Sequence, residues 1–282
     1  MAARILSRWL PPVLADAARA LRDAMGTSEW HVAPDGFTRT PRGAGWEDES
    51  IVATQAARWA AYVQRTAGTG PLGFSGESES DAPQDDVAHN SAMVFAYTLA
   101  RASHGRERMA LLDWGGGLGQ YGVLARALMP EVEIDYHCRD LAHLAARGRT
   151  LLAGATFHDD DTCLARRYDL VLASSSLQYH EDWRGALAKL AAATEGFLLV
   201  TRMPVTLSAP GYVVVQRPHR HGYMTEYPGW VLDRDELISA GGALGLVLQR
   251  EFLIGERPRI PGAPSPCEYR GFLWRAERVA GA

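Results

Sequence analysis

A glycine-rich turn between an apolar strand and a helix places the strongest constraint on the fold of this chain. The segment 111–122 reads LLDWGGGLGQYG and follows residues typical of a buried strand. Glycine reaches positive φ values at little cost and lets a ligand approach the backbone where a Cβ would clash. The first N–H groups of the helix that follows lack partners within it, so they can face a carboxylate or a phosphate. The segment therefore predicts a strand-turn-helix unit that binds a ligand.

The glycines fit two motifs that imply different ligands. The dinucleotide motif GxGxxG fits Gly117, Gly119 and Gly122. The pattern DxGxGxG begins instead at Asp113, and its first glycine is Gly115. A carboxylate at the end of the strand repels a pyrophosphate and attracts a ligand that carries an ammonium or sulfonium group. The charge of Asp113 therefore favours the second pattern.

Strand and helix patterns alternate from the glycine-rich turn onward, and they predict an α/β fold. Apolar runs such as 168–174 (YDLVLAS) and 196–201 (GFLLVT) are typical of strands buried on both faces of a parallel sheet. Right-handed crossovers then give a Rossmann-like, doubly wound and mostly parallel sheet between two layers of helices. The link between the last two strands leaves no room for a helix, so these strands form a C-terminal antiparallel pair. The predicted strands are 108–114, 132–138, 155–158, 168–174, 196–201, 246–254 and 268–275, and the predicted helices are 119–128, 141–149, 182–193 and 233–243.

The region before the turn has a different pattern, and we assign residues 1–105 to a helical N-terminal extension. Apolar residues at helical spacing predict helices that end near residue 25, over 48–65 and over 87–103, with a Gly/Pro-rich loop at 30–46. The α/β domain then spans 106–282. An aromatic-rich insertion at 204–232 interrupts its alternation, and a loop of this length is typical of a lid or a binding loop.

Composition and charge exclude several classes of protein. Of the 282 residues, 47% are hydrophobic, which suits a folded domain, and the net charge of −4 argues against a sequence-independent nucleic-acid binder. No stretch is apolar and long enough to span a bilayer, and Pro11 and Pro12 interrupt the signal-like N-terminus. The three cysteines lie far apart without CxxC spacing, so the reducing cytoplasm is the expected compartment.

The segment DWGGGLG (113–119) resembles motif I of the class I S-adenosylmethionine-dependent methyltransferases. Together with SSSLQYHEDW (174–183) and TRMP (201–204), it is similar to a bacterial group of methyltransferases associated with surface-polysaccharide gene clusters. The resemblance covers most of the chain. It implies a class I methyltransferase domain over 106–282, an enzyme that uses S-adenosylmethionine as its cofactor, and a C-terminal antiparallel strand pair.

The resemblance also implies which residues hold the cofactor. Asp113 would face the ammonium end of the cofactor, and Gly115, Gly117 and Gly119 would line the loop beneath it. Asp140 ends the second strand of the domain, where a carboxylate accepts hydrogen bonds from the ribose hydroxyls. The same aspartate could instead cap the helix that follows.

Further candidates follow the third and fourth strands. Asp159 or Asp160 would lie near the adenine amine, or the two could form a solvated turn. Ser174 closes the fourth strand and would border the cofactor. His180 lies just beyond, at the sheet edge where ligands bind in open α/β folds, and its near-neutral pKa suits a general base. His180 could instead cap the helix that begins near residue 182.

The insertion 204–232 is the candidate acceptor site. Aromatic faces with hydroxyl and imidazole edges suit a sugar or a flat, polar molecule, so we assign acceptor binding to His221, Tyr223 and Tyr227. Alternatively, 213–215 (VVV) forms an extra strand and the aromatic side chains only pack. In a strand, His219 and His221 would point the same way and could join Glu226 in a metal triad. The flanking residues do not fit such a motif, so no metal is expected.

The sequence thus predicts a methyltransferase that acts on a small-molecule or carbohydrate-like acceptor, at an oxygen atom. Two alternatives remain open. One is an NAD(P)-dependent oxidoreductase that uses the GxGxxG frame, and the other is a non-catalytic scaffold that retains the cofactor cleft. The expected partner is a small molecule, with no nucleic acid and no membrane span, and the helical extension could also form a homodimer contact.

Overall fold

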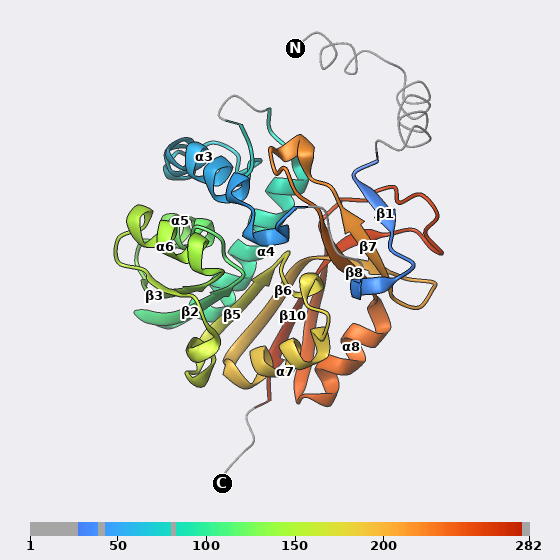
Figure 1. The fold of residues 1–282 in the computed structure, drawn as a ribbon. Coiled ribbons are helices and arrows are strands. Elements are labelled where there is room, and N and C mark those ends of the chain that lie inside the picture. The colour runs from blue at the N-terminus through green and yellow to red at the C-terminus, as the bar shows by residue number, and fades with distance from the viewer. Residues whose placement is uncertain (1–27, 39–42, 80–82, 278–282) are drawn as a thin grey trace.

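The computed structural model describes residues 28–38, 43–79 and 83–277. Its centre is a twisted sheet with helices on both faces (Figure 1). Along the sheet the order is β4–β3–β2–β5–β6, and neighbouring strands in this part are parallel. The bounds are Thr156–His158 for β4, Glu133–Arg139 for β3, Arg108–Trp114 for β2, Tyr168–Ser174 for β5 and Thr194–Thr206 for β6.

An antiparallel pair completes this sheet beyond β6. β10 (Glu268–Ala276) lies between β6 and β9 (Leu246–Leu253) and is antiparallel to both. The predicted C-terminal pair is therefore confirmed, and so is the mostly parallel, Rossmann-like fold class.

Helices cover the two faces of the sheet in separate layers. Alternate residues of β5 show the division, because Leu170 and Leu172 pack into one hydrophobic cluster whereas Val171 and Ala173 pack into the other. The cluster of Leu170 and Leu172 lies under α4 (Asp86–Ser103), α5 (Gln120–Leu128) and α6 (Ala142–Leu151), and the cluster of Val171 and Ala173 lies under α7 (Trp183–Ala193) and α8 (Arg234–Ala243). Among the described residues, no helix has the length and apolar character needed to cross a membrane.

The predicted helices at 48–65 and 87–103 are present as α3 (Glu49–Ala67) and α4. Asp48 and Asp85 cap them, each accepting a hydrogen bond from the backbone N–H two residues later. Ile51 of α3 and Phe95 of α4 are fully buried in the same cluster as the sheet residue Leu111. The segment before β2 thus shares its core with the sheet, and the domain boundary at 105 stays a prediction. The helix predicted to end near residue 25 lies outside the described residues.

The insertion 204–232 and the predicted loop at 30–46 differ from expectation, because both contain strands. β7 (Tyr212–Gln216) pairs with β1 (Trp30–Val32) and with β8 (Tyr227–Asp233), in each case antiparallel. The β-branched run at 213–215 favours a strand, in agreement with the alternative interpretation that this run forms an extra strand. β1 was not predicted from the sequence, because its partner strand β7 is remote in the chain. β8 joins this small sheet to the end of β6.

A substitution of Trp274 tests whether the hydrophobic cluster under α7 and α8 is part of the core. Its side chain is fully buried on β10 beside the ring of Phe272. We expect Trp274→Ala to lower the free energy of unfolding by about 3–5 kcal/mol, because the cavity cannot fully collapse. The control is Leu253→Ala on β9, whose side chain is 62% exposed and which we expect to change stability by less than about 0.5 kcal/mol. Urea denaturation measures both, and equal small losses would contradict the core assignment.

Candidate functional site

The glycine-rich turn lies where the strand order of the sheet reverses. From β2 the chain moves outward to β3, and it later returns to pair β5 with the other side of β2. Ligands of open α/β sheets bind at this reversal, beyond the carboxyl ends of the strands. Gly115, Gly117 and Gly119 have φ values of 76°, 59° and 92°, which other residues adopt at a cost. Gly119 is the N-cap residue of α5, directly before Gln120, and provides no side-chain cap.

Asp113, the next-to-last residue of β2, is completely buried beneath this loop. The hydroxyl of Tyr136 donates to its Oδ2 at 2.6 Å, whereas Oδ1 has no hydrogen-bond partner among the described residues. Burial raises the pKa of Asp113 to about 7, although the hydrogen bond from Tyr136 opposes the shift. A cationic group that reached Oδ1 would favour the ionised carboxylate.

Gly116 is a residue of the site that sequence reasoning missed. A Cβ at this position would lie 2.4 Å from Oδ2 of Asp113 and 2.8 Å from Sγ of Cys138. Both neighbours are fully buried, so neither can move away easily. In the pattern DxGxGxG this glycine occupies a variable position, and the run of three glycines was its only signal.

Asp140 ties the loop to the end of β3. Its Oδ2 accepts from the backbone N–H of Gly117 at 2.6 Å, and its Oδ1 accepts from the N–H of Leu141 at 2.7 Å. Burial raises the pKa of Asp140, and the two backbone hydrogen bonds oppose the shift. This carboxylate therefore has a structural part in holding the loop, and each oxygen keeps a lone pair for a further donor.

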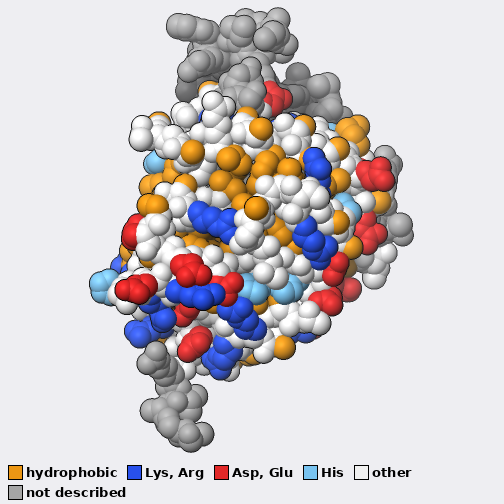
Figure 2. Space-filling view, turned by 90° about the vertical axis from the view of Figure 1, so that its left-hand side faces the viewer, with side chains coloured by type: hydrophobic (Ala, Val, Ile, Leu, Met, Phe, Trp, Pro, Cys, Tyr) orange, Lys and Arg blue, Asp and Glu red, His pale blue; other side chains and the backbone are white. Residues whose placement is uncertain are grey.

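A groove of about 570 Å³ lies between the start of α3 and the start of α6, and its lining includes Leu141, the residue after Asp140. Val52 and Leu141 give it an apolar side, and Nε2 of His143 is buried there without a hydrogen-bond partner among the described residues. Figure 2 views the side of the molecule that carries α6, and hydrophobic side chains gather in the upper part of this face. Flat aromatic groups suit a groove of this kind.

Ser174 faces the same end of the sheet, and Asp159 makes a different contact. The hydroxyl of Tyr121 on α5 lies 2.9 Å from Oγ of Ser174, which links the end of β5 to the helix that begins at the glycine loop. Burial raises the pKa of Tyr121. Asp159 is half-exposed and pairs with Arg149 of α6 at 3.4 Å. Its predicted place near an adenine stays a prediction.

His180 lies on the other side of the strand end from the groove. Its ring stacks on Trp114 with centroids 4.5 Å apart, and Trp114 belongs to the cluster under α7 and α8. Burial lowers the pKa of His180, and the positive charge of Arg139 lowers it further. The imidazole is therefore neutral at pH 7, as a general base must be.

Tyr223 of the insertion is connected to the glycine loop through Gln55 of α3. Its side chain is buried, and its hydroxyl accepts from Nε2 of Gln55 at 3.1 Å and donates to Glu77 at 2.9 Å. Gln55 comes from α3, and a Cβ built on Gly117 would lie 3.0 Å from its Oε1. A predicted acceptor residue is thus one side chain away from the predicted cofactor loop. Gln55 is a second residue that the sequence did not single out.

The other two predicted acceptor residues, His221 and Tyr227, make different contacts from those of Tyr223. His221 belongs to a short 3-10 turn rather than a strand, and its Nε2 lies 4.0 Å from the carboxylate of Glu29. Tyr227 is buried, with its ring stacked on Trp46 at 4.2 Å. Among the described residues, no cluster of three or more His, Cys, Asp or Glu side chains has the arrangement of a metal site.

Arg202 marks a bulge in β6 at the same end of the sheet. Thr201 and Arg202 together oppose Gly271 of β10, and Arg202 adopts a φ of 49°. Ser175, after the neighbouring strand β5, has a φ of 52° and donates its N–H to the carbonyl of Thr201. Nε of Arg202 is buried without a hydrogen-bond partner among the described residues. Strained backbone of this kind gathers at functional sites, so we add Arg202 to the candidates.

No protein-family model and no curated protein matches the sequence. Solved methyltransferase structures align with the chain at low identity. A S-adenosylmethionine-dependent methyltransferase from Clostridium acetobutylicum is 10% identical, with 70% of this chain and 93% of that one covered and a TM-score of 0.46. A sugar N-methyltransferase from Streptoalloteichus is 14% identical, with 67% and 87% covered and a TM-score of 0.47. The 1,6-didemethyltoxoflavin-N1-methyltransferase of Burkholderia thailandensis, solved with S-adenosylhomocysteine, is 16% identical, with 84% and 92% covered and a TM-score of 0.44. At these values the likeness assigns neither a family nor an activity to this chain.

Proposed function

We propose that this chain is a S-adenosylmethionine-dependent methyltransferase that acts on a small-molecule or carbohydrate-like acceptor, at an oxygen atom. One observation carries the proposal. A buried carboxylate, Asp113, lies at the carboxyl end of β2 directly beneath a glycine loop at the reversal point of the sheet, and its Oδ1 is without a partner among the described residues. This atom suits the ammonium end of the cofactor, whereas a pyrophosphate would meet a negative charge.

The chain's own residues fit such a cofactor. Asp113 would accept a hydrogen bond from the ammonium group, and Asp140 would accept from the ribose hydroxyls while it holds Gly117 in place. The groove beside Leu141 would take the adenine, with His143 at its rim. When bound, the cofactor supplies a methyl group that is already activated for displacement, so much of the protein's contribution is placement.

The acceptor has candidate partners on two sides. His180, neutral because its pKa is lowered, would accept the proton of an acceptor hydroxyl. Tyr223 and Gln55 would orient that acceptor over the glycine loop through their hydroxyl and amide groups. His221, Tyr227, Asp159 and Ser174 keep their sequence-based assignments within this proposal. The cytoplasm, a homodimer contact and a link to surface polysaccharides belong to it on sequence grounds alone.

The oxidoreductase alternative has one observation in its favour. A Cβ at Gly122 would lie 2.7 Å from the ring of Tyr136, so this glycine allows close packing of α5 on β3. The third glycine of GxGxxG has that part in dinucleotide-binding folds. The charge of Asp113 still opposes a pyrophosphate in the same loop.

Calorimetric titration of the full chain with S-adenosylhomocysteine and, separately, with NADH distinguishes the methyltransferase from the oxidoreductase. We expect saturable binding of S-adenosylhomocysteine and none of NADH. Asp113→Ala should abolish the binding of S-adenosylhomocysteine without unfolding the chain, which circular dichroism checks. Binding of NADH alone would refute the methyltransferase, and a wild-type chain that binds S-adenosylhomocysteine but methylates no hydroxylated acceptor would indicate the non-catalytic scaffold.

A further inference from the structure

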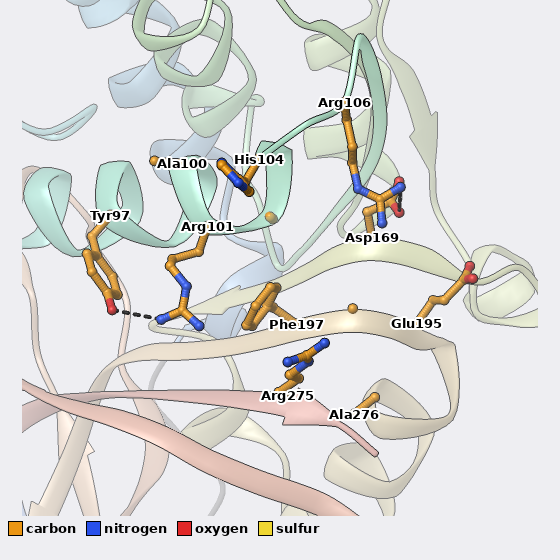
Figure 3. Close-up of a pocket in the computed structure, with 12 residues that line it drawn as sticks. Tyr97, Ala100, Arg101, His104, Arg106, Asp169, Glu195, Phe197, Arg275 and Ala276 are labelled. Carbon is orange, nitrogen blue, oxygen red and sulfur yellow. Dashed lines mark hydrogen bonds and ion pairs between the residues drawn. The ribbon is translucent and has the colours of Figure 1, made fainter. Parts of the chain in front are cut away.

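A second groove lies at the opposite end of the sheet from the glycine loop. Its volume is about 530 Å³, and it is formed by the last turns of α4, the first residues of β5 and β6, and the end of β10 (Figure 3). Parallel strands β5 and β6 begin here, whereas the glycine loop follows the carboxyl end of β2. The groove is therefore a separate site from the one described above.

Two arginines flank one aromatic ring in this groove. Arg275 of β10 and Phe197 of β6 are directly opposed in the antiparallel register, so their side chains lie on the same face of the sheet. Arg101, in the last turns of α4, places its guanidinium carbon 5.3 Å from the centroid of the Phe197 ring. Figure 3 shows both guanidinium groups on either side of that ring.

Neither of these arginines has a carboxylate partner among the described residues. Arg101 donates to the neutral hydroxyl of Tyr97 at 2.8 Å, which leaves its charge uncompensated. The Arg275 side chain makes no hydrogen bond or ion pair within the described ranges. Both side chains are exposed, so water screens them, but two cations held beside one ring still repel each other.

The acidic residues of the groove do not cancel this charge. Asp169 is engaged by Arg106 at 3.0 Å and by the backbone N–H of Ala110 at 2.8 Å, so that ion pair is self-contained. Glu195 is the other carboxylate of the lining, and Figure 3 shows its side chain directed away from Arg101 and Arg275. The end of the groove around Phe197 is therefore cationic.

We propose that this groove binds a phosphate-bearing small molecule. Arg101 and Arg275 would hold the phosphate, because the planar guanidinium fork matches phosphate oxygens and a dianion neutralises both cations. Phe197 and Tyr97 would pack against a flat, apolar part of the same ligand. The volume suits a molecule of nucleotide size.

Calorimetric titration of the full chain with ADP, with pyrophosphate and with the dicarboxylate succinate tests this site. We expect saturable binding of ADP and pyrophosphate, and binding of succinate that is at least about tenfold weaker. Arg101→Gln and Arg275→Gln should each weaken ADP binding about tenfold or more. The control is Arg250→Gln on β9, which removes the same charge from an exposed residue outside the groove and should change affinity less than about twofold.

Saturation with S-adenosylhomocysteine keeps this test separate from the proposed function. ADP should bind the saturated protein as tightly as the free protein, because the groove and the glycine loop lie at opposite ends of the sheet. The site is refuted if ADP shows no saturable binding, if Arg250→Gln weakens binding as much as Arg275→Gln, or if S-adenosylhomocysteine displaces ADP. If succinate bound as tightly as ADP, the proposed selectivity of the groove for phosphate would be refuted.

Discussion

Replacing Gly116 with alanine should strongly weaken the binding of S-adenosylhomocysteine. The added Cβ would lie 2.4 Å from Oδ2 of Asp113 and 2.8 Å from Sγ of Cys138, and both atoms belong to fully buried residues. The loop must therefore move away from the end of β2, which separates the carboxylate from the backbone N–H groups around it. We expect affinity for S-adenosylhomocysteine to fall about 100-fold or more, with a loss of about 1–3 kcal/mol in the free energy of unfolding.

A matched alanine substitution controls for this change. Gly242 on α8 has a helical position with no atom within 4 Å of a built Cβ, so Gly242→Ala should leave both stability and affinity unchanged or slightly raise stability. Calorimetry measures the affinity for S-adenosylhomocysteine, and circular dichroism at the titration temperature confirms that the Gly116→Ala chain is folded. A folded Gly116→Ala chain with wild-type affinity would show that the glycine loop is not the cofactor site.

The affinity for S-adenosylhomocysteine should also rise with pH and level off above about pH 7. In the free protein burial raises the pKa of Asp113 to about 7, so below that pH the carboxyl is mostly neutral. The ammonium group of the ligand needs the ionised form, so the dissociation constant should increase about tenfold for each pH unit below 7. Titrations between pH 5 and pH 8 measure this slope.

Stability should change with pH in the opposite sense. The folded-state pKa of Asp113 lies above its unfolded value of 3.8, so the neutral carboxyl stabilises the fold at low pH, and that contribution is lost as pH rises to about 7. Relative to Asp113→Asn, the free protein should lose about 1 kcal/mol per pH unit between pH 5 and pH 7. The asparagine variant should bind weakly with no pH dependence in this range. A wild-type dissociation constant that is flat from pH 5 to pH 8 would contradict the role of Asp113.

Sequence reasoning predicted the parts of the fold that depend on local pattern. The apolar strand 168–174 and the glycine-rich turn are where their patterns place them, because burial on both faces and a strand-helix reversal leave signals in neighbouring residues. The pairing of Trp30 with Gln216 left no such signal, because the two residues meet only after the insertion folds back on residues 30–32. For the same reason the contact of Tyr223 with Gln55 was not predictable from either segment.

The sequence by itself determined the alternation of strands and helices and the presence of a carboxylate before a glycine loop, because backbone preference and apolar periodicity act over a few residues. Only the tertiary structure decided what surrounds those groups. It buries Asp113 under Gly116 and beside Tyr136, and it brings Arg101 and Arg275 together beside the ring of Phe197 (Figure 3). These contacts join segments that are remote in the chain, and the pKa of a carboxyl or the pairing of a guanidinium depends on such neighbours rather than on its own sequence.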